Sequence, residues 1–177
     1  MTSEEFEAAT GALLREVAPM TLATCAGNVP WASDVYFASS GFDLVFFSSL
    51  DSRHCRNLAA NPSCAVTVHA PVATWRDIRG VQIEGVAGLA NTVGEKARAL
   101  AAYVEKFPFA RDLMANPVGA VRTAFRAHAH VFRPMRIRYL DNGRGIGARF
   151  SVAIVDGKPV WPPQREKAGA DVQWTHD

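Results

Sequence analysis

The sequence predicts a mainly β domain: a small closed or partly split barrel of six antiparallel strands, with two or three helices on its outside. Three observations predict this class. Short runs rich in β-branched and aromatic residues alternate with turn signals, and helical periodicity is confined to a few segments. Strands of this number and length avoid unpaired edges when their sheet closes on itself. At 177 residues, the chain is long enough for one globular domain.

The first segment reads as an amphipathic helix followed by a β-meander. Thr2 and Glu5 have the spacing of a capping box, and apolar residues continue at helical spacing until Pro19. Turn signals such as Ala26-Gly27-Asn28 then separate short apolar runs. The strands expected here are Met20–Ala26, Trp31–Phe37 and Asp43–Ser49.

The middle of the chain alternates helices and strands. Asp51 or Ser52 is expected to cap a short helix that Asn61-Pro62 stops. The remaining predicted elements are strands Cys64–His69, Ile78–Leu89 and His130–Tyr139, a helix over Val93–Phe107, one more turn over Ala110–Met114, and a glycine-rich loop over Asp141–Gly147. The last strand is expected to break at Pro134. We expect one domain over 1–155, including the helix at 3–18, and a Pro-rich extension over 156–177 that is extended or partly disordered.

Composition excludes several classes of function. Lys and Arg number 19 against 17 Asp and Glu, and a net charge of +2 provides no broad field for nucleic acid. No apolar run reaches the roughly 20 residues that cross a bilayer, so no membrane partner is expected. The acidic N-terminus does not resemble a signal peptide, and a cytoplasmic location is expected. Three cysteines without metal-ligand spacing are interpreted as reduced thiols.

The segment after the third strand has the composition of an anion-binding corner. Ser48-Ser49 end the strand, and Ser52-Arg53-His54 open a short helix that also carries Arg56. Backbone N–H groups, hydroxyls and basic side chains can converge on one phosphate there, because the helix dipole and the fixed charges have the same sign. A phosphorylated small molecule is the first ligand to expect. The competing interpretation is an ordinary solvated helix start with Ser52 as its cap.

Further motifs follow this corner in a recognisable order. They are Asn57-Leu58, Asn61-Pro62, a strand, and Arg79-Gly80-Val81-Gln82-Ile83-Glu84-Gly85. With them, the chain resembles the pyridoxamine 5′-phosphate oxidase-like FMN-binding split barrels over about residues 20–142. It is most similar to the YhbP-like bacterial branch, where Ile78 to Gln82, Phe107-Pro108, and Asp141-Asn142 with Gly145-x-Gly147 recur. The resemblance implies a six-stranded antiparallel split β-barrel of the Greek-key type.

The resemblance also implies an FMN cofactor and the residues that bind it. These are Ser33, Asp34 and Val35 along the flavin ring, Phe47, Ser48 and Ser49 near the ribityl chain and phosphate, Ser52, Arg53 and His54 in the phosphate clamp, and Arg79 and Gln82 on the later long strand. An interval of three places Arg79 and Gln82 on opposite strand faces, so a bulge is needed for both to touch one ligand.

Two departures from the family pattern bear on function. His54 stands where relatives carry lysine, and because histidine is only partly charged near neutral pH, phosphate affinity is expected to weaken as the pH rises. The stretch Arg133–Arg138 and the tail after it do not match the ending of a true pyridoxamine 5′-phosphate oxidase. The resemblance therefore implies an FMN-dependent oxidoreductase for an unidentified small-molecule substrate, with no identifiable catalytic residue. It also implies a homodimer with the cofactor at the subunit interface.

The alternative from a different class is a non-catalytic flavin- or haem-binding barrel. In the haem case, His54, His69, His128 or His130 could be the axial ligand. His128 and His130 share one strand face, but no carboxylate stands at a suitable short spacing, so no metal site is expected there. Five aromatic residues could stack on a flavin ring, although strand aromatics more often lie in a core or a dimer interface. They are Trp31, Tyr36, Phe46, Phe47 and Trp75.

Overall fold

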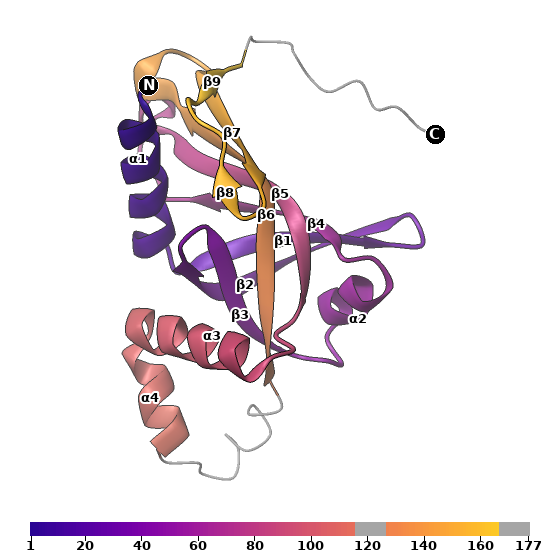
Figure 1. Ribbon diagram of the computed structural model, residues 1–177. Coiled ribbons are helices and arrows are strands. Elements are labelled where there is room, and N and C mark those ends of the chain that lie inside the picture. Colours follow the sequence, from indigo (N-terminus) through magenta and orange to yellow (C-terminus); the bar gives the residue numbers. More distant parts are fainter. Residues whose placement is uncertain (116–126, 167–177) are drawn as a thin grey trace.

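The computed structural model describes residues 1–115 and 127–166, and in it six strands close into an antiparallel barrel (Figure 1). They are β1 (Pro19–Ala26), β2 (Val29–Ser40), β3 (Asp43–Ser49), β4 (Ser63–His69), β5 (Arg79–Leu89) and β6 (Ala127–Asp141). They pair in the cyclic order β1, β2, β3, β6, β5, β4 and back to β1. Because β3 pairs with β6, each barrel strand has a neighbour on both sides, and the predicted fold class is confirmed.

The helices begin where the sequence signals indicate. They are α1 (Ser3–Glu16), α2 (Arg53–Ala60), α3 (Val93–Lys106) and α4 (Pro108–Ala115), with short 3-10 turns η1 (Trp75–Asp77) and η2 (Asn142–Arg144). The capping box of Thr2 and Glu5 is present, and Ser52 rather than Asp51 caps α2. The single turn expected after α3 is a separate helix, α4. In the described ranges, no helix is both long and apolar enough to span a membrane.

Three strands after β6 were not predicted. They are β7 (Arg149–Val155), β8 (Lys158–Pro159) and β9 (Gln164–Arg165). β7 pairs with β6, and both β8 and β9 pair with β7, so the expected extended arm begins as part of the sheet. Asp156 and Gly157 form the β7–β8 turn with φ of 50° and 72°. The end of the predicted extension, residues 167–177, lies outside the described residues.

A bulge in the middle of β5 and β6 bends the sheet around the barrel. The register shifts between Glu84 and Gly85, so that Gly85 faces Pro134 and Met135 projects outward, 60% exposed. A Cβ on Gly85 would clash with the carbonyl oxygen of Arg133, so this close approach requires glycine. A break was expected at Pro134, but β6 continues through this residue. Pro134 sits at the bulge, where its missing N–H costs the ladder least.

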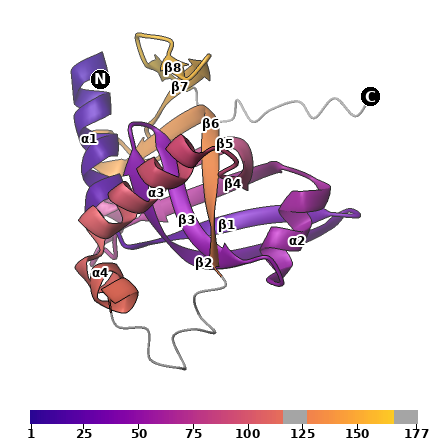
Figure 2. The same ribbon diagram turned by 60° about the horizontal axis from the view of Figure 1, so that its bottom comes forward.

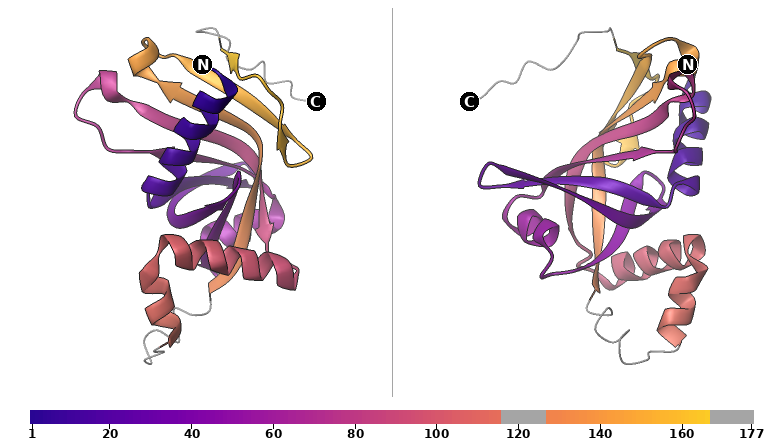
Figure 3. Two further views of the ribbon diagram at one scale, coloured as in Figure 1. Left: turned by 60° about the vertical axis from the view of Figure 1, so that its left-hand side comes forward. Right: turned by 180° about the vertical axis from the view of Figure 1, so that it is seen from behind.

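The core fills the barrel and continues under α1. Its largest fully buried side chains are Phe6, Leu14, Met20, Leu22, Phe37, Leu44, Phe46, Val68, Val81, Ile83, Phe132 and Ile137. Phe6 comes from α1, which crosses one face of the barrel (Figure 3). The Phe6 ring meets the Tyr139 ring edge-on, with 6.3 Å between centroids. On another face, α3 packs Ala99 against Val45 and Val131. α2 lies away from both, beside the β1–β2 hairpin (Figure 2).

Candidate functional site

The predicted clamp residues meet at the junction of β3 and α2. Nε2 of His54 lies 2.7 Å from Oγ of Ser48 and 3.1 Å from Oγ of Ser52. The Ser52 hydroxyl also accepts from the backbone N–H of Cys55, which caps the helix. Ser49 is turned to the connecting loop, where its Oγ accepts from the N–H of Asp51. Two hydroxyls, one imidazole and a helix N-terminus therefore converge. We call Ser48, Ser52, Arg53 and His54 the corner.

The positive charge of the corner is not neutralised. Arg53 is exposed, and its Cζ lies 4.3 Å from the centre of the Trp31 ring. Arg56, one turn along α2, donates to the backbone carbonyl of Asp51. Among the described residues, no carboxylate forms an ion pair with Arg53, His54 or Arg56. Open guanidinium donors beside hydroxyls are a suitable environment for a phosphate.

The environment of His54 favours the neutral form of its imidazole. Burial lowers its pKa below the ordinary value. Behind it, His130 stacks on Phe46 with 4.9 Å between ring centroids, and burial lowers the pKa of His130 as well. Neutral Nε2 of His54 can accept from the serine hydroxyls, whereas a bound phosphate would require it to donate. If a phosphate binds at the corner, its binding would therefore be linked to proton uptake.

Two asparagines hold α2 in place. Nδ2 of Asn57 donates to Oγ1 of Thr24 at 3.0 Å, and both side chains are buried. Nδ2 of Asn61 donates to the carbonyl of Cys25 at 3.2 Å. These bonds fix the helix on β1, so its N-terminus stays at the end of β3. They give a structural reason for the asparagines in the sequence motif.

The predicted ring-side residues divide between two surfaces. Ser33 accepts from Nε1 of Trp31 at 2.8 Å and is thereby linked to the corner. Asp34 lies on the outer barrel face, where it accepts from Oγ1 of Thr21 at 2.6 Å. The side chain of Val35 is 9% exposed and belongs to the core, so only its backbone is left for a ligand.

Gln82 and Asp34 lie on the same outward-facing side of the barrel sheet. Cross-strand pairing aligns Asp34, Thr21, Thr67, Gln82 and Arg138 in one row. The adjacent row contains Ala32, Ala23, Ala65 and Glu84. A shallow groove of about 300 Å³ runs over these rows. The three alanine side chains of the second row make this part of the sheet flat, and the polar side chains of the first row border it. We call these two rows the outer face.

Arg79 lies far from the corner within one chain. It faces Asp141 at the start of β5, whereas the other end of β5 pairs Leu89 with His130, close to the corner. Ten residue steps along a strand correspond to roughly 30 Å. The register shows no shift between Arg79 and Gln82, so the bulge that would bring both to one ligand is absent from that interval. Instead, Nε of Arg79 pairs with Oδ1 of Asp141 at 3.6 Å.

Phe47 faces α3, where its ring meets Tyr103 edge-on at 4.9 Å between centroids. It also lines a cavity of about 380 Å³ together with Leu89, Leu100, Lys96 and His128. His69 is exposed at the end of β4. In the part of the chain that the structure describes, no three His, Cys, Asp or Glu residues are arranged to hold a metal ion.

Comparison with known proteins gives the family. The model of the pyridoxamine 5′-phosphate oxidase family matches residues 6–140, and the chain belongs to this family. A relative in Photorhabdus laumondii, UPF0306 protein plu4501, is 27% identical over 92 residues, which cover 50% of this chain and 63% of that protein. This supports the predicted similarity to the YhbP-like branch.

Many solved structures share the fold, and two of them are reported as binding a cofactor. A haem-binding protein of Mycobacterium smegmatis is 25% identical, with a TM-score of 0.65, over 85% of this chain and 57% of that one. A FAD-binding protein of Mesorhizobium loti is 19% identical, with a TM-score of 0.57, over 72% of this chain and 88% of that one. The chain thus spans less than two thirds of the length of the Photorhabdus laumondii and Mycobacterium smegmatis proteins.

Proposed function

We propose that this protein binds FMN and holds its phosphate at the corner. The observation that carries the proposal is that the Ser48 and Ser52 hydroxyls converge with His54 at the N-terminus of α2, next to Arg53, which has no ion-paired carboxylate among the described residues. Family membership supports a flavin as the phosphorylated ligand. Arg53 would bind phosphate oxygens through its planar donors, and His54 would donate from Nε2 once protonated.

The flavin ring would lie along β2, next to Ser33 and Asp34. The outer face is suited to a planar group, because Ala23, Ala32 and Ala65 present no large side chains there. We propose that a second copy of the chain covers this face and completes the site, with Gln82 close to the ring. A flavin shared between subunits would couple dimerisation to cofactor binding.

Bound FMN would supply two-electron redox chemistry, and the proposed activity is oxidoreduction of a small organic substrate. The residues of the chain would bind and orient the flavin. Anaerobic reduction of the FMN-loaded protein by NADH or NADPH tests this activity. Flavin bleaching that is restored by air supports it, whereas no bleaching with either nucleotide would remove nicotinamide donors from the proposal.

The absorption spectrum of the purified protein, with and without added FMN, tests cofactor binding. Flavin bands that survive gel filtration, and a melting temperature that rises with FMN concentration, are the expected results. Riboflavin, which lacks the phosphate, is the matched control and should stabilise the protein less. A protein that binds neither compound would contradict the proposal.

Haem is the second candidate, on a separate observation. The cavity beside α3 joins apolar walls from Phe47, Leu89 and Leu100 to one exposed imidazole, His128, and one cation, Lys96. An imidazole can ligate haem iron, and a cation can pair with a propionate. A Soret band upon haem addition that His128→Ala removes would support this candidate. A protein that gains flavin bands and no Soret band would exclude it.

A further inference from the structure

We propose that Trp31 is a positioning residue that holds Arg53 ready for phosphate. This inference rests on the proposed FMN function. The Trp31 ring is 39% exposed, and Cζ of Arg53 lies 4.3 Å from its centre. That distance is well within the range in which an aromatic face attracts a guanidinium.

Trp31 is held both at its indole ring and at its backbone. Its Nε1 donates to Oγ of Ser33 at 2.8 Å, which sets the orientation of the ring. Its backbone pairs with Thr24 across the β1–β2 hairpin. Because Thr24 also accepts from Asn57, the same strand position anchors both the ring and α2. Trp31 and Arg53 are therefore held relative to each other by contacts outside their own pair.

Stacking is the appropriate way to hold an arginine that must bind an anion. An ion pair with a carboxylate would occupy the in-plane N–H groups and cancel the charge. An aromatic ring contacts only the flat face and leaves the edge donors available. Among the described residues, Arg53 has no hydrogen-bonded or ion-paired protein acceptor. The guanidinium is thus positioned without being neutralised.

The chain contains a matched control for this pair. Cζ of Arg76 lies 4.9 Å from the centre of the exposed Trp75 ring, on η1. Trp75 and Arg76 have the same chemistry but lie outside the corner, on a 3-10 turn whose first residue has no side-chain cap. Substitutions there control for general effects of losing a surface tryptophan or arginine.

The test is a double-mutant cycle on FMN affinity, measured by quenching of flavin fluorescence. Trp31→Leu should weaken binding about threefold to tenfold, the factor expected from one cation–π contact. Trp31→Phe keeps an aromatic face but loses the hydrogen bond to Ser33, so its affinity should lie between those of the wild type and Trp31→Leu. Trp75→Leu should leave the affinity unchanged. In the Arg53→Ala background, Trp31→Leu should cause no further loss, because its effect passes through Arg53.

Several outcomes would overturn the inference. An undiminished affinity in Trp31→Leu would show that Arg53 needs no support, and an equal loss in the Arg53→Ala background would show that Trp31 contacts the flavin directly. Trp31→Phe keeps the inference testable if Trp31→Leu unfolds, since a loss in folded Trp31→Phe that persists in the Arg53→Ala background contradicts it. If the wild-type protein does not bind FMN, the proposed function itself fails and takes this inference with it.

Discussion

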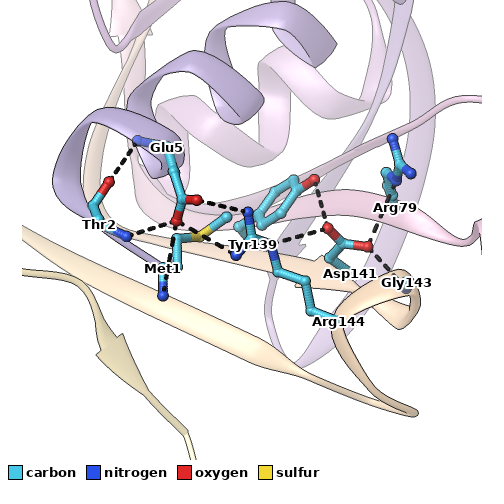
Figure 4. Close-up of polar contacts among 8 residues, drawn as sticks. All are labelled: Met1, Thr2, Glu5, Arg79, Tyr139, Asp141, Gly143 and Arg144. Carbon is cyan, nitrogen blue, oxygen red and sulfur yellow. Dashed lines mark hydrogen bonds and ion pairs between the residues drawn. The ribbon is translucent and has the colours of Figure 1, made fainter.

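The two ends of the barrel both gather arginines, but they treat the positive charge in opposite ways. At the end opposite the corner, Arg79 and Arg144 lie 3.6 Å and 3.5 Å from the carboxylate oxygens of Asp141, and Arg144 also pairs with Glu5 at 3.3 Å (Figure 4). We call Glu5, Arg79, Asp141 and Arg144 the ion network. At the corner, Arg53 faces the Trp31 ring, with no ion-paired carboxylate among the described residues.

We interpret the ion network as a structural cluster and the corner as the proposed binding site. The ion network joins α1, β5 and η2, and Asp141 also accepts from the N–H of Gly143 at 2.9 Å. Its charges cancel, so its contribution is to stability. At the corner, the charge of Arg53 has no carboxylate partner among the described residues, so it remains available to an anion. The number of arginines in a region is therefore less informative than the partner of each one.

The largest expected effect is that of Arg53→Ala on FMN binding. At pH 8, this change should weaken binding about tenfold to hundredfold, because a charged hydrogen bond contributes about 1.5–3 kcal/mol. The loss should exceed that of His54→Ala at the same pH, since arginine remains charged there. Titration calorimetry measures both, with Arg76→Ala as the control. Equal losses in the two corner variants, or no loss in either, would contradict the phosphate assignment.

Asp141→Ala should act on stability instead. The substitution removes a 7% exposed carboxylate that meets two arginines and one backbone N–H, so we expect a loss of about 1–3 kcal/mol in the free energy of unfolding. Urea unfolding measures it, and Glu105→Ala, which removes an exposed carboxylate from α3, is the control. FMN affinity of the folded protein should be unchanged. A variant that keeps its stability but loses FMN would reverse the roles assigned to the two ends.

The pH dependence of FMN affinity tests His54. Burial lowers its pKa in the free protein, and a phosphate beside it would raise that pKa in the complex. Between those two values, the complex holds more protons than the free protein, so affinity falls as the pH rises through this window. We expect a decrease of up to about tenfold between pH 6.5 and pH 8.5. His54→Lys should flatten the profile, and a wild-type profile that is already flat would remove His54 from the clamp.

Arg79→Ala should have the smallest effect. The side chain is 60% exposed, and such ion pairs contribute less than about 1 kcal/mol to stability. Thermal unfolding with and without FMN measures both properties, and we expect a slightly lower melting temperature with an unchanged FMN-dependent shift. A clear loss of FMN affinity would restore the assignment implied by the family pattern, with Arg79 reaching a flavin on another subunit.

The corner was predictable because it is local. All four of its residues come from one stretch in which a strand ends and a helix begins, and their signals are a serine cap and two basic residues in the first turn. The missed strand β7 also had a local signal. Apolar and other residues alternate from Arg149 to Val155, and the Asp156-Gly157 that follows is a hairpin signal, but the Pro-rich stretch after it favoured an extended arm.

Local patterns were sufficient for the positions of the six barrel strands along the chain, the capping box of the first helix and the residues of the corner, because periodicity and capping depend on neighbours within a few positions. They were insufficient to tell which arginine is neutralised. Asp141 meets Arg79 only because β5 and β6 pair in this register, and Glu5 reaches Arg144 only because α1 crosses the closed barrel. Trp31 meets Arg53 only because Asn57 docks α2 on β1. These contacts join distant segments, and closure of the barrel brings them together.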